Sequence, residues 1–152
     1  MTRHTYVYVT YILSTSEKVW EALTDATISA SFWERENVSD WKAGSRWEHR
    51  VPGKSADVVG SVLESDPPRR LVTTWEVPGE EGNPDKTSRC AYDIEDLGGK
   101  VRLTVTHADL DAPGFQDVSG GWPAVLSNLK TLLETGRTIP DPFSALRGHR
   151  QA

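Results

Sequence analysis

Residues 122–136 read WPAVLSNLKTLLETG, and this stretch decides the fold. Its apolar side chains recur at steps of three and four residues, which is the period of one face of an α-helix. They are Trp122, Val125, Leu126, Leu129, Leu132 and Leu133. Pro123 suits the first turn of such a helix, and Gly136 stands where a left-handed C-terminal cap is expected. The polar face is predicted to carry Ser127, Asn128, Lys130 and Thr131.

Strands are predicted in the region that precedes this helix. Residues 38–108 divide into alternating segments separated by turn residues, which is typical of an antiparallel meander. The turns are expected at 42–44, 52–54, 66–68, 78–86 and 98–99. Along the strands, apolar and aromatic side chains share one face, because alternate residues of a strand point the same way. A sheet with one apolar face needs a cover, and the C-terminal helix supplies it.

The N-terminal segment predicts a strand and two short helices. Residues 6–12 are β-branched and aromatic, and Val7, Val9 and Tyr11 share a face. Ser14 to Glu17 match a capping box, which predicts a helix from about Thr15 to Leu23, and Asp25 is expected to cap a second one. The fold class is therefore α+β, with a curved antiparallel sheet wrapped around the long C-terminal helix. We assign residues 1–140 to a single domain and residues 141–152 to a C-terminal tail, which has no clear period and could also be a docked strap.

Composition excludes several classes of partner. The chain of 152 residues carries 17 basic and 22 acidic residues and has no Lys/Arg cluster, so nucleic acid is not expected as a partner. No run of 18 apolar residues occurs, and the N-terminus lacks a signal-peptide pattern, which predicts no membrane insertion and a cytoplasmic location. Cys90 is the single cysteine, which excludes an intramolecular disulfide and predicts a small buried strand residue.

The order of motifs resembles a known family. VWEALTD at 19–25, Trp41 with Gly44, Gly60, DPPRRL at 66–71 with Trp75, and Gly121-Trp122 leading into LETG at 133–136 are similar to the homologues of the activator of the 90-kDa heat-shock-protein ATPase. This family belongs to the START-like, or helix-grip, superfamily. The resemblance covers about residues 6–136. It implies a scaffold that holds a ligand between sheet and C-terminal helix, and a link to the stress response.

The candidate site residues are those expected on the inner faces of sheet and helix. They are Trp33, Trp47, His49, Trp75, Tyr92, His107, Trp122, Leu126 and Leu129. Large aromatic rings at these positions can wall an apolar pocket, although a fully packed core would use the same residues. The two histidines could serve as hydrogen-bonding groups of that pocket, or they could be satisfied by backbone groups or water.

No motif for catalysis, metal or cofactor is present. HxxxH, HxH, CxxC, G-x-S-x-G and glycine-rich phosphate loops are absent, so we predict no catalytic residue, no metal and no cofactor. The leading prediction is a noncatalytic binder of a small apolar or amphipathic molecule, acting as a monomer or homodimer. An enzyme of the cyclase, dehydratase or hydrolase type in the same cavity is one alternative. A protein-interaction or co-chaperone-like module, marked by an exposed apolar patch at Trp33 or Phe143, is another.

Overall fold

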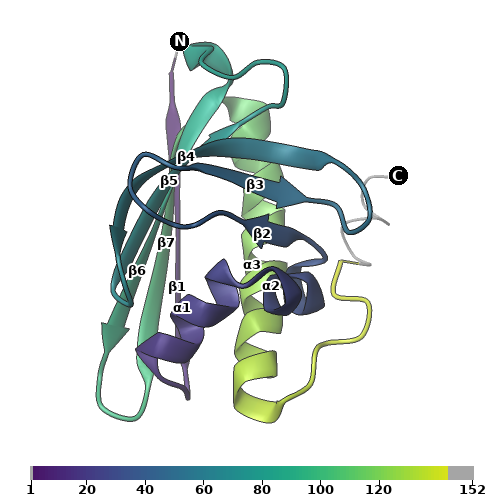
Figure 1. Cartoon of the computed structure of the whole chain (residues 1–152). Helices are drawn as coiled ribbons and strands as arrows, with labels where there is room; N and C mark the ends of the chain where they lie inside the picture. Colours follow the sequence, from purple (N-terminus) through teal and green to yellow (C-terminus); the bar gives the residue numbers. More distant parts are fainter. Residues whose placement is uncertain (1, 144–152) are drawn as a thin grey trace.

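The structure is a computed structural model that describes residues 2–143, so residues 144–152 of the predicted tail lie outside the described part. The elements in chain order are β1 (His4–Ile12), α1 (Ser16–Thr24), α2 (Ala26–Trp33), β2 (Glu36–Val38), β3 (Arg46–Arg50), β4 (Ala56–Asp66), β5 (Arg70–Glu76), the 3₁₀ turn η1 (Pro84–Lys86), β6 (Thr87–Asp96), β7 (Val101–Leu110) and α3 (Ala112–Thr135). Figure 1 shows the sheet curving around α3, with α1 and α2 together near the lower end of that helix.

The sheet confirms the predicted fold class. Its seven strands lie in the order β1-β7-β6-β5-β4-β3-β2, and every neighbouring pair is antiparallel. Strands β2 to β7 are therefore the predicted meander, and β1 joins its far edge beside β7. The chain is an α+β protein with a long C-terminal helix and two short helices after the first strand.

The helix α3 begins ten residues earlier than the amphipathic pattern indicates. Asp111 caps it by accepting a 2.8 Å hydrogen bond from the Gly114 backbone N–H. The prediction that Pro123 lies in the first turn is wrong, because Pro123 lies inside the helix. The glycines at 114, 120 and 121 have low helix propensity and leave no apolar stripe, which hid the first half of α3. At the other end the prediction holds, since Gly136 adopts φ 78° and its N–H bonds to the Leu132 carbonyl.

The two short helices form close to their predicted positions. Thr15, rather than Ser14 of the predicted capping box, caps α1 by accepting from the Lys18 backbone N–H at 3.2 Å. Asp25 caps α2 as expected, because its carboxylate accepts from the Ile28 N–H at 2.9 Å. Trp33 is the last residue of α2 and lies in the interior, with 8% of its surface exposed.

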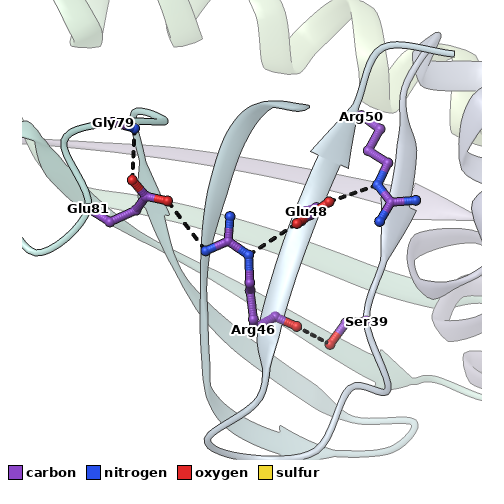
Figure 2. Close-up of polar contacts among 6 residues, drawn as sticks. All are labelled: Ser39, Arg46, Glu48, Arg50, Gly79 and Glu81. Atoms are coloured by element: carbon purple, nitrogen blue, oxygen red, sulfur yellow. Dashed lines mark hydrogen bonds and ion pairs between the residues drawn. The ribbon is translucent and has the colours of Figure 1, made fainter. Parts of the chain in front are cut away.

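Strand β3 illustrates the alternation that separates interior from surface. Trp47 and His49 point inward and are buried, with 2% and 4% of their surface exposed. The alternate residues of β3 point outward and form ion pairs, in which Arg46 and Arg50 both bind Glu48 (Figure 2). Arg46 also pairs with Glu81, which lies outside this strand. Such exposed pairs contribute about 0–1 kcal/mol each, so burial of the opposite face dominates the stability of this strand.

A glycine in β4 allows the side chain of Trp47 to reach across this strand to β5. The Trp47 indole N–H donates to the Thr74 carbonyl at 2.8 Å, and this bond passes over Gly60. A Cβ added at Gly60 would lie 2.3 Å from that carbonyl oxygen. Only glycine therefore fits here, and Trp47 is fixed in the core beside β5. None of the helices within residues 2–143 is long and apolar enough to cross a membrane.

Candidate functional site

The predicted aromatic side chains meet around Trp75. Its ring centroid lies 5.5 Å from that of Trp47, 5.9 Å from that of Trp122 and 6.3 Å from that of Trp33. Tyr92 joins the group through Trp122, at 6.0 Å and in an edge-on arrangement. The rings come from β3, β5, β6, α2 and α3, so the whole fold is needed to bring them together.

Two clefts reach this aromatic group from different sides. Cleft A, of about 350 Å³, is lined by Ser88 and His107 of the sheet and by Asp117 and Val118 of α3. Cleft B, of about 430 Å³, is lined by Trp33, His49, Val58, Gly121, Val125 and Phe143. Trp75 lines both and is the one residue that their described linings share. Its indole therefore stands between two neighbouring hollows along the N-terminal half of α3.

His107, beside cleft A, has protein partners at both ring nitrogens. Trp122 Nε1 donates to His107 Nδ1 at 3.1 Å, and His107 Nε2 lies 2.8 Å from Ser88 Oγ. Because an indole N–H can only donate, Nδ1 must accept, and the neutral ring carries its proton on Nε2. Burial lowers the pKa of His107 to about 4, so the ring is neutral near pH 7. In this tautomer Nε2 cannot take a proton from Ser88, and the pair lacks the arrangement of a serine nucleophile and its base.

His49, beside cleft B, is held at one ring nitrogen. Its Nδ1 lies 2.6 Å from Asn37 Oδ1, and its ring contacts Trp33 and Trp75 with centroid distances of 4.7 and 5.3 Å. Burial lowers the pKa of His49 to about 4, with Asp57 acting in the opposite direction and Arg35 in the same direction. The ring is therefore neutral at neutral pH, like that of His107.

The remaining predicted site residues lie in the core and line neither cleft. They are Trp47, Tyr92, Trp122, Leu126 and Leu129, all at most 4% exposed. The burial of Leu129 confirms which face of α3 points inward. Of the nine candidates, Trp33, His49, Trp75 and His107 therefore lie at clefts, and their binding of a ligand remains a prediction.

Asn128 was assigned to the polar face of α3, and this prediction is wrong. Its side chain is 1% exposed and bonds to the Phe32 carbonyl and to the Ile139 N–H, at 2.9 and 2.6 Å. The second bond holds the segment after α3 against the fold, and this segment turns back beside α3 in Figure 1. Phe143, near its end, lines cleft B. Residues 137–143 thus form a strap that is docked on the fold, although their sequence has no clear hydrophobic period.

Asn37, Val125 and Gly121 are further residues around cleft B that were not among the candidates. Asn37 is 3% exposed and belongs to the three-residue strand β2, which is too short to show a pattern. A Cβ added at Gly121 would meet no atom within 4 Å, so the helix leaves room here. A gap of this kind depends on the packing of three elements and leaves no signal in sequence.

Some of the charged groups near the clefts form ion pairs. At the mouth of cleft B, Arg35 bonds to the Asp57 carboxylate at 3.0 Å. Glu64 pairs with Arg70 on the surface, away from both histidines. Among residues 2–143, no three His, Cys, Asp or Glu side chains gather in a metal-binding arrangement. Burial raises the pKa of the Cys90 thiol to about 12, so a thiolate is scarce at neutral pH.

The exposed apolar surface lies elsewhere than expected. Trp33 is 8% exposed and packs in the core, and Phe143 packs against it, so neither forms the anticipated patch. Val7, Val9 and Tyr11 share a face of β1 as predicted, and this face is open to solvent, with 54%, 46% and 49% exposed. Because β1 is an edge strand, its apolar outer face is next to an unpaired edge.

Comparison with solved structures supports the same fold. CalU16 from Micromonospora echinospora matches with a TM-score of 0.73 and 22% identity over 93% of this chain and 72% of its own. An HSP90 activator from Plasmodium falciparum matches with a TM-score of 0.73 and 16% identity, over 85% and 95% of the two chains. The Aha1 dimer from Colwellia psychrerythraea matches with a TM-score of 0.71 and 19% identity, over 88% and 98%. No curated protein sequence matches the chain.

A family model adds the sequence evidence that these distant structures lack. It matches residues 14–134, which is more than half of the chain, and it describes the activator of Hsp90 ATPase homolog 1-like proteins. The match spans α1, both cleft histidines and nearly all of α3. The chain therefore belongs to the family of activator of Hsp90 ATPase homolog 1-like proteins.

Proposed function

We propose that this protein binds a small apolar or amphipathic molecule in cleft B and performs no chemistry on it. The observation that carries the proposal is the composition of the cleft: Trp33, Trp75 and Phe143 provide aromatic surface, and Val125 and Val58 add aliphatic surface. A volume of about 430 Å³ lies within the usual range of ligand pockets. The paired charges of Arg35 and Asp57 lie at the mouth, where an amphipathic molecule would keep its polar end.

The enzyme alternative has less support. An inward histidine bonded to a carboxylate would have favoured acid–base chemistry. Within residues 2–143, the hydrogen-bond partner of His49 is Asn37, and those of His107 are Trp122 and Ser88. Both rings are neutral near pH 7, and in the described part of the chain neither is hydrogen-bonded to a carboxylate. The buried thiol of Cys90 fits the same picture and the reducing conditions of the cytoplasm.

The proposal is tested by filling the cleft. Gly121→Leu places a side chain in open space at cleft B and replaces a weak helix former with a strong one. Asp117→Leu is the matched control, because Asp117 lies on the same helix and lines cleft A. Wild type and Asp117→Leu should bind 1-anilinonaphthalene-8-sulfonate saturably and with a stoichiometry near one, whereas Gly121→Leu should lose at least about tenfold in affinity. Equal binding by all three proteins would contradict the proposal.

A second candidate function is self-association through β1. Residues 5–13 contain no charged residue, although natural edge strands are usually protected by charges. Antiparallel pairing of β1 with β1 of a second copy would place Val7 and Val9 beside the same residues of the other copy across a two-fold axis, where their apolar side chains would contact one another. The dimer reported for the Colwellia psychrerythraea relative supports this candidate. Sedimentation should show a dimer that Val9→Lys dissociates and that Val77→Lys, at a 48% exposed control position, does not; a monomeric wild type would refute it.

A further inference from the structure

The ring of His49 offers cleft B one hydrogen-bonding atom of known polarity. Asn37 Nδ2 donates to the Leu23 carbonyl at 2.9 Å. A flipped amide would place its oxygen against that carbonyl, and two acceptors would face each other, so the orientation of Asn37 is fixed. Its Oδ1 therefore points at His49 Nδ1, which must be the donor in their 2.6 Å hydrogen bond.

It follows that Nε2 of the neutral ring carries a lone pair and no proton. Among residues 2–143, the hydrogen bond of the His49 ring is the one at Nδ1, and no group donates to Nε2. His49 is 4% exposed and lines cleft B, so the cleft is the route by which a donor can reach it. Water can reach this nitrogen while the cleft is open, whereas an occupant that covered it without supplying a donor would leave an acceptor buried and unpaired, at a cost of about 1–3 kcal/mol.

The surroundings of this nitrogen are flat and aromatic. Trp33 and Trp75 lie with centroids 6.3 Å apart and planes inclined by 27°, and both contact the His49 ring. Both indoles thus line the cleft beside the histidine ring, with their planes nearly parallel to each other. The charged groups nearest to His49 are Asp57 and Arg35, which pair with each other at the mouth. A ligand therefore needs no net charge to fit.

We propose that cleft B selects a planar aromatic molecule that carries one hydroxyl or N–H donor, such as a phenol or an indole, with the donor bound to His49 Nε2. The ring packs against Trp33 and Trp75, and Val125 and Phe143 contact its remaining edge. This inference rests on the proposed function of the cleft, and it adds the chemical class of the ligand. An apolar ring without a donor would leave the acceptor unpaired and would bind less tightly.

Indole and indene test this selectivity, because they have the same shape and differ in an N–H that becomes a CH₂. Isothermal titration of wild type should give at least about tenfold tighter binding of indole, although indene is the more apolar compound. In His49→Phe the preference should disappear. Gly121→Leu should weaken both compounds, and Asp117→Leu should leave both unchanged. Because the comparison of the two ligands is made on wild type, it does not depend on the folding of the His49 variant.

The outcomes separate this inference from the proposed function. If indene binds cleft B as tightly as indole, and Gly121→Leu abolishes both, the cleft is a binding site without donor selectivity and the inference fails. If neither compound binds while 1-anilinonaphthalene-8-sulfonate does, the aromatic ligand class is wrong and the cleft keeps its function. If no probe binds saturably, both proposals fail.

Discussion

The two buried histidines of this protein have similar surroundings but differ in how many of their ring nitrogens form a hydrogen bond. Each contacts Trp75, and burial lowers the pKa of each to about 4. His107 has a partner at both nitrogens, Trp122 and Ser88, whereas His49 has one at Nδ1 only. A histidine whose polar atoms are all used stabilises the fold, and one with an atom left over can also recognise a ligand. The two clefts therefore differ in whether the ring nitrogens of their histidine all have partners, and they do not differ in the burial or the pKa of that histidine.

The largest effect that both histidines share is a loss of stability in acid. Because their folded-state pKa values lie near 4 and the unfolded value is 6.5, the unfolded chain binds protons between these limits that the folded chain does not. The free energy of unfolding should be undiminished above about pH 6.5 and should fall by about 3 kcal/mol per histidine on the way to pH 4. Urea titrations at a series of pH values measure this.

Single substitutions show how much of the loss of stability at low pH comes from each histidine. His49→Gln and His107→Gln should each remove about half of the pH dependence, and His4→Gln serves as the control at the N-terminal end of β1. An unchanged dependence in both glutamine variants would show that carboxyl groups cause it.

Removing the Trp75 side chain, which lines both clefts, should abolish the separation between them. Trp75→Ala deletes the indole that lines both, so the two hollows should merge into one. Truncation of a large aromatic residue costs about 3–5 kcal/mol in a core, and the half-buried position of Trp75 favours the lower value. Val77→Ala, two residues along the same face of the chain and largely exposed, should cost under about 0.5 kcal/mol. Similar losses in both variants would show that Trp75 is not a structural wall.

The aromatic group and the sheet could be predicted from sequence, and the clefts could not. Alternation along the strands placed Trp47, His49 and His107 inside, since a period of two residues reports which face is buried. The pattern cannot report hydrogen-bond partners, which come from distant elements: Asn37 from β2 for one histidine and Trp122 from α3 for the other. The prediction for Asn128 was wrong for the same reason. A polar residue was expected on the surface, but two backbone groups in the interior form hydrogen bonds with its amide.

The smallest expected effect is the difference between replacing the two histidines. His107→Phe removes the acceptor of the Trp122 N–H and one of the two partners of Ser88 Oγ, which keeps a 3.4 Å bond to the Trp75 carbonyl. His49→Phe removes only the partner of Asn37 Oδ1. Since each buried polar atom left unpaired costs about 1–3 kcal/mol, we expect His107→Phe to destabilise by about 1–2 kcal/mol more. Denaturant titration at pH 7.5 isolates this difference from protonation. A larger loss in His49→Phe would reverse the assigned roles.

The protonation pattern of the two rings can be observed directly by long-range ¹H–¹⁵N correlation of the histidine side chains near pH 7.5, recorded with and without indole. We predict that His107 carries its proton on Nε2 and His49 on Nδ1, because Trp122 donates to the first ring and Asn37 accepts from the second. Indole should shift the Nε2 signal of His49 toward that of a hydrogen-bonded acceptor and should leave both signals of His107 in place. A proton on Nε2 of His49, or an indole shift confined to His107, would contradict the assignment of cleft B as the binding site.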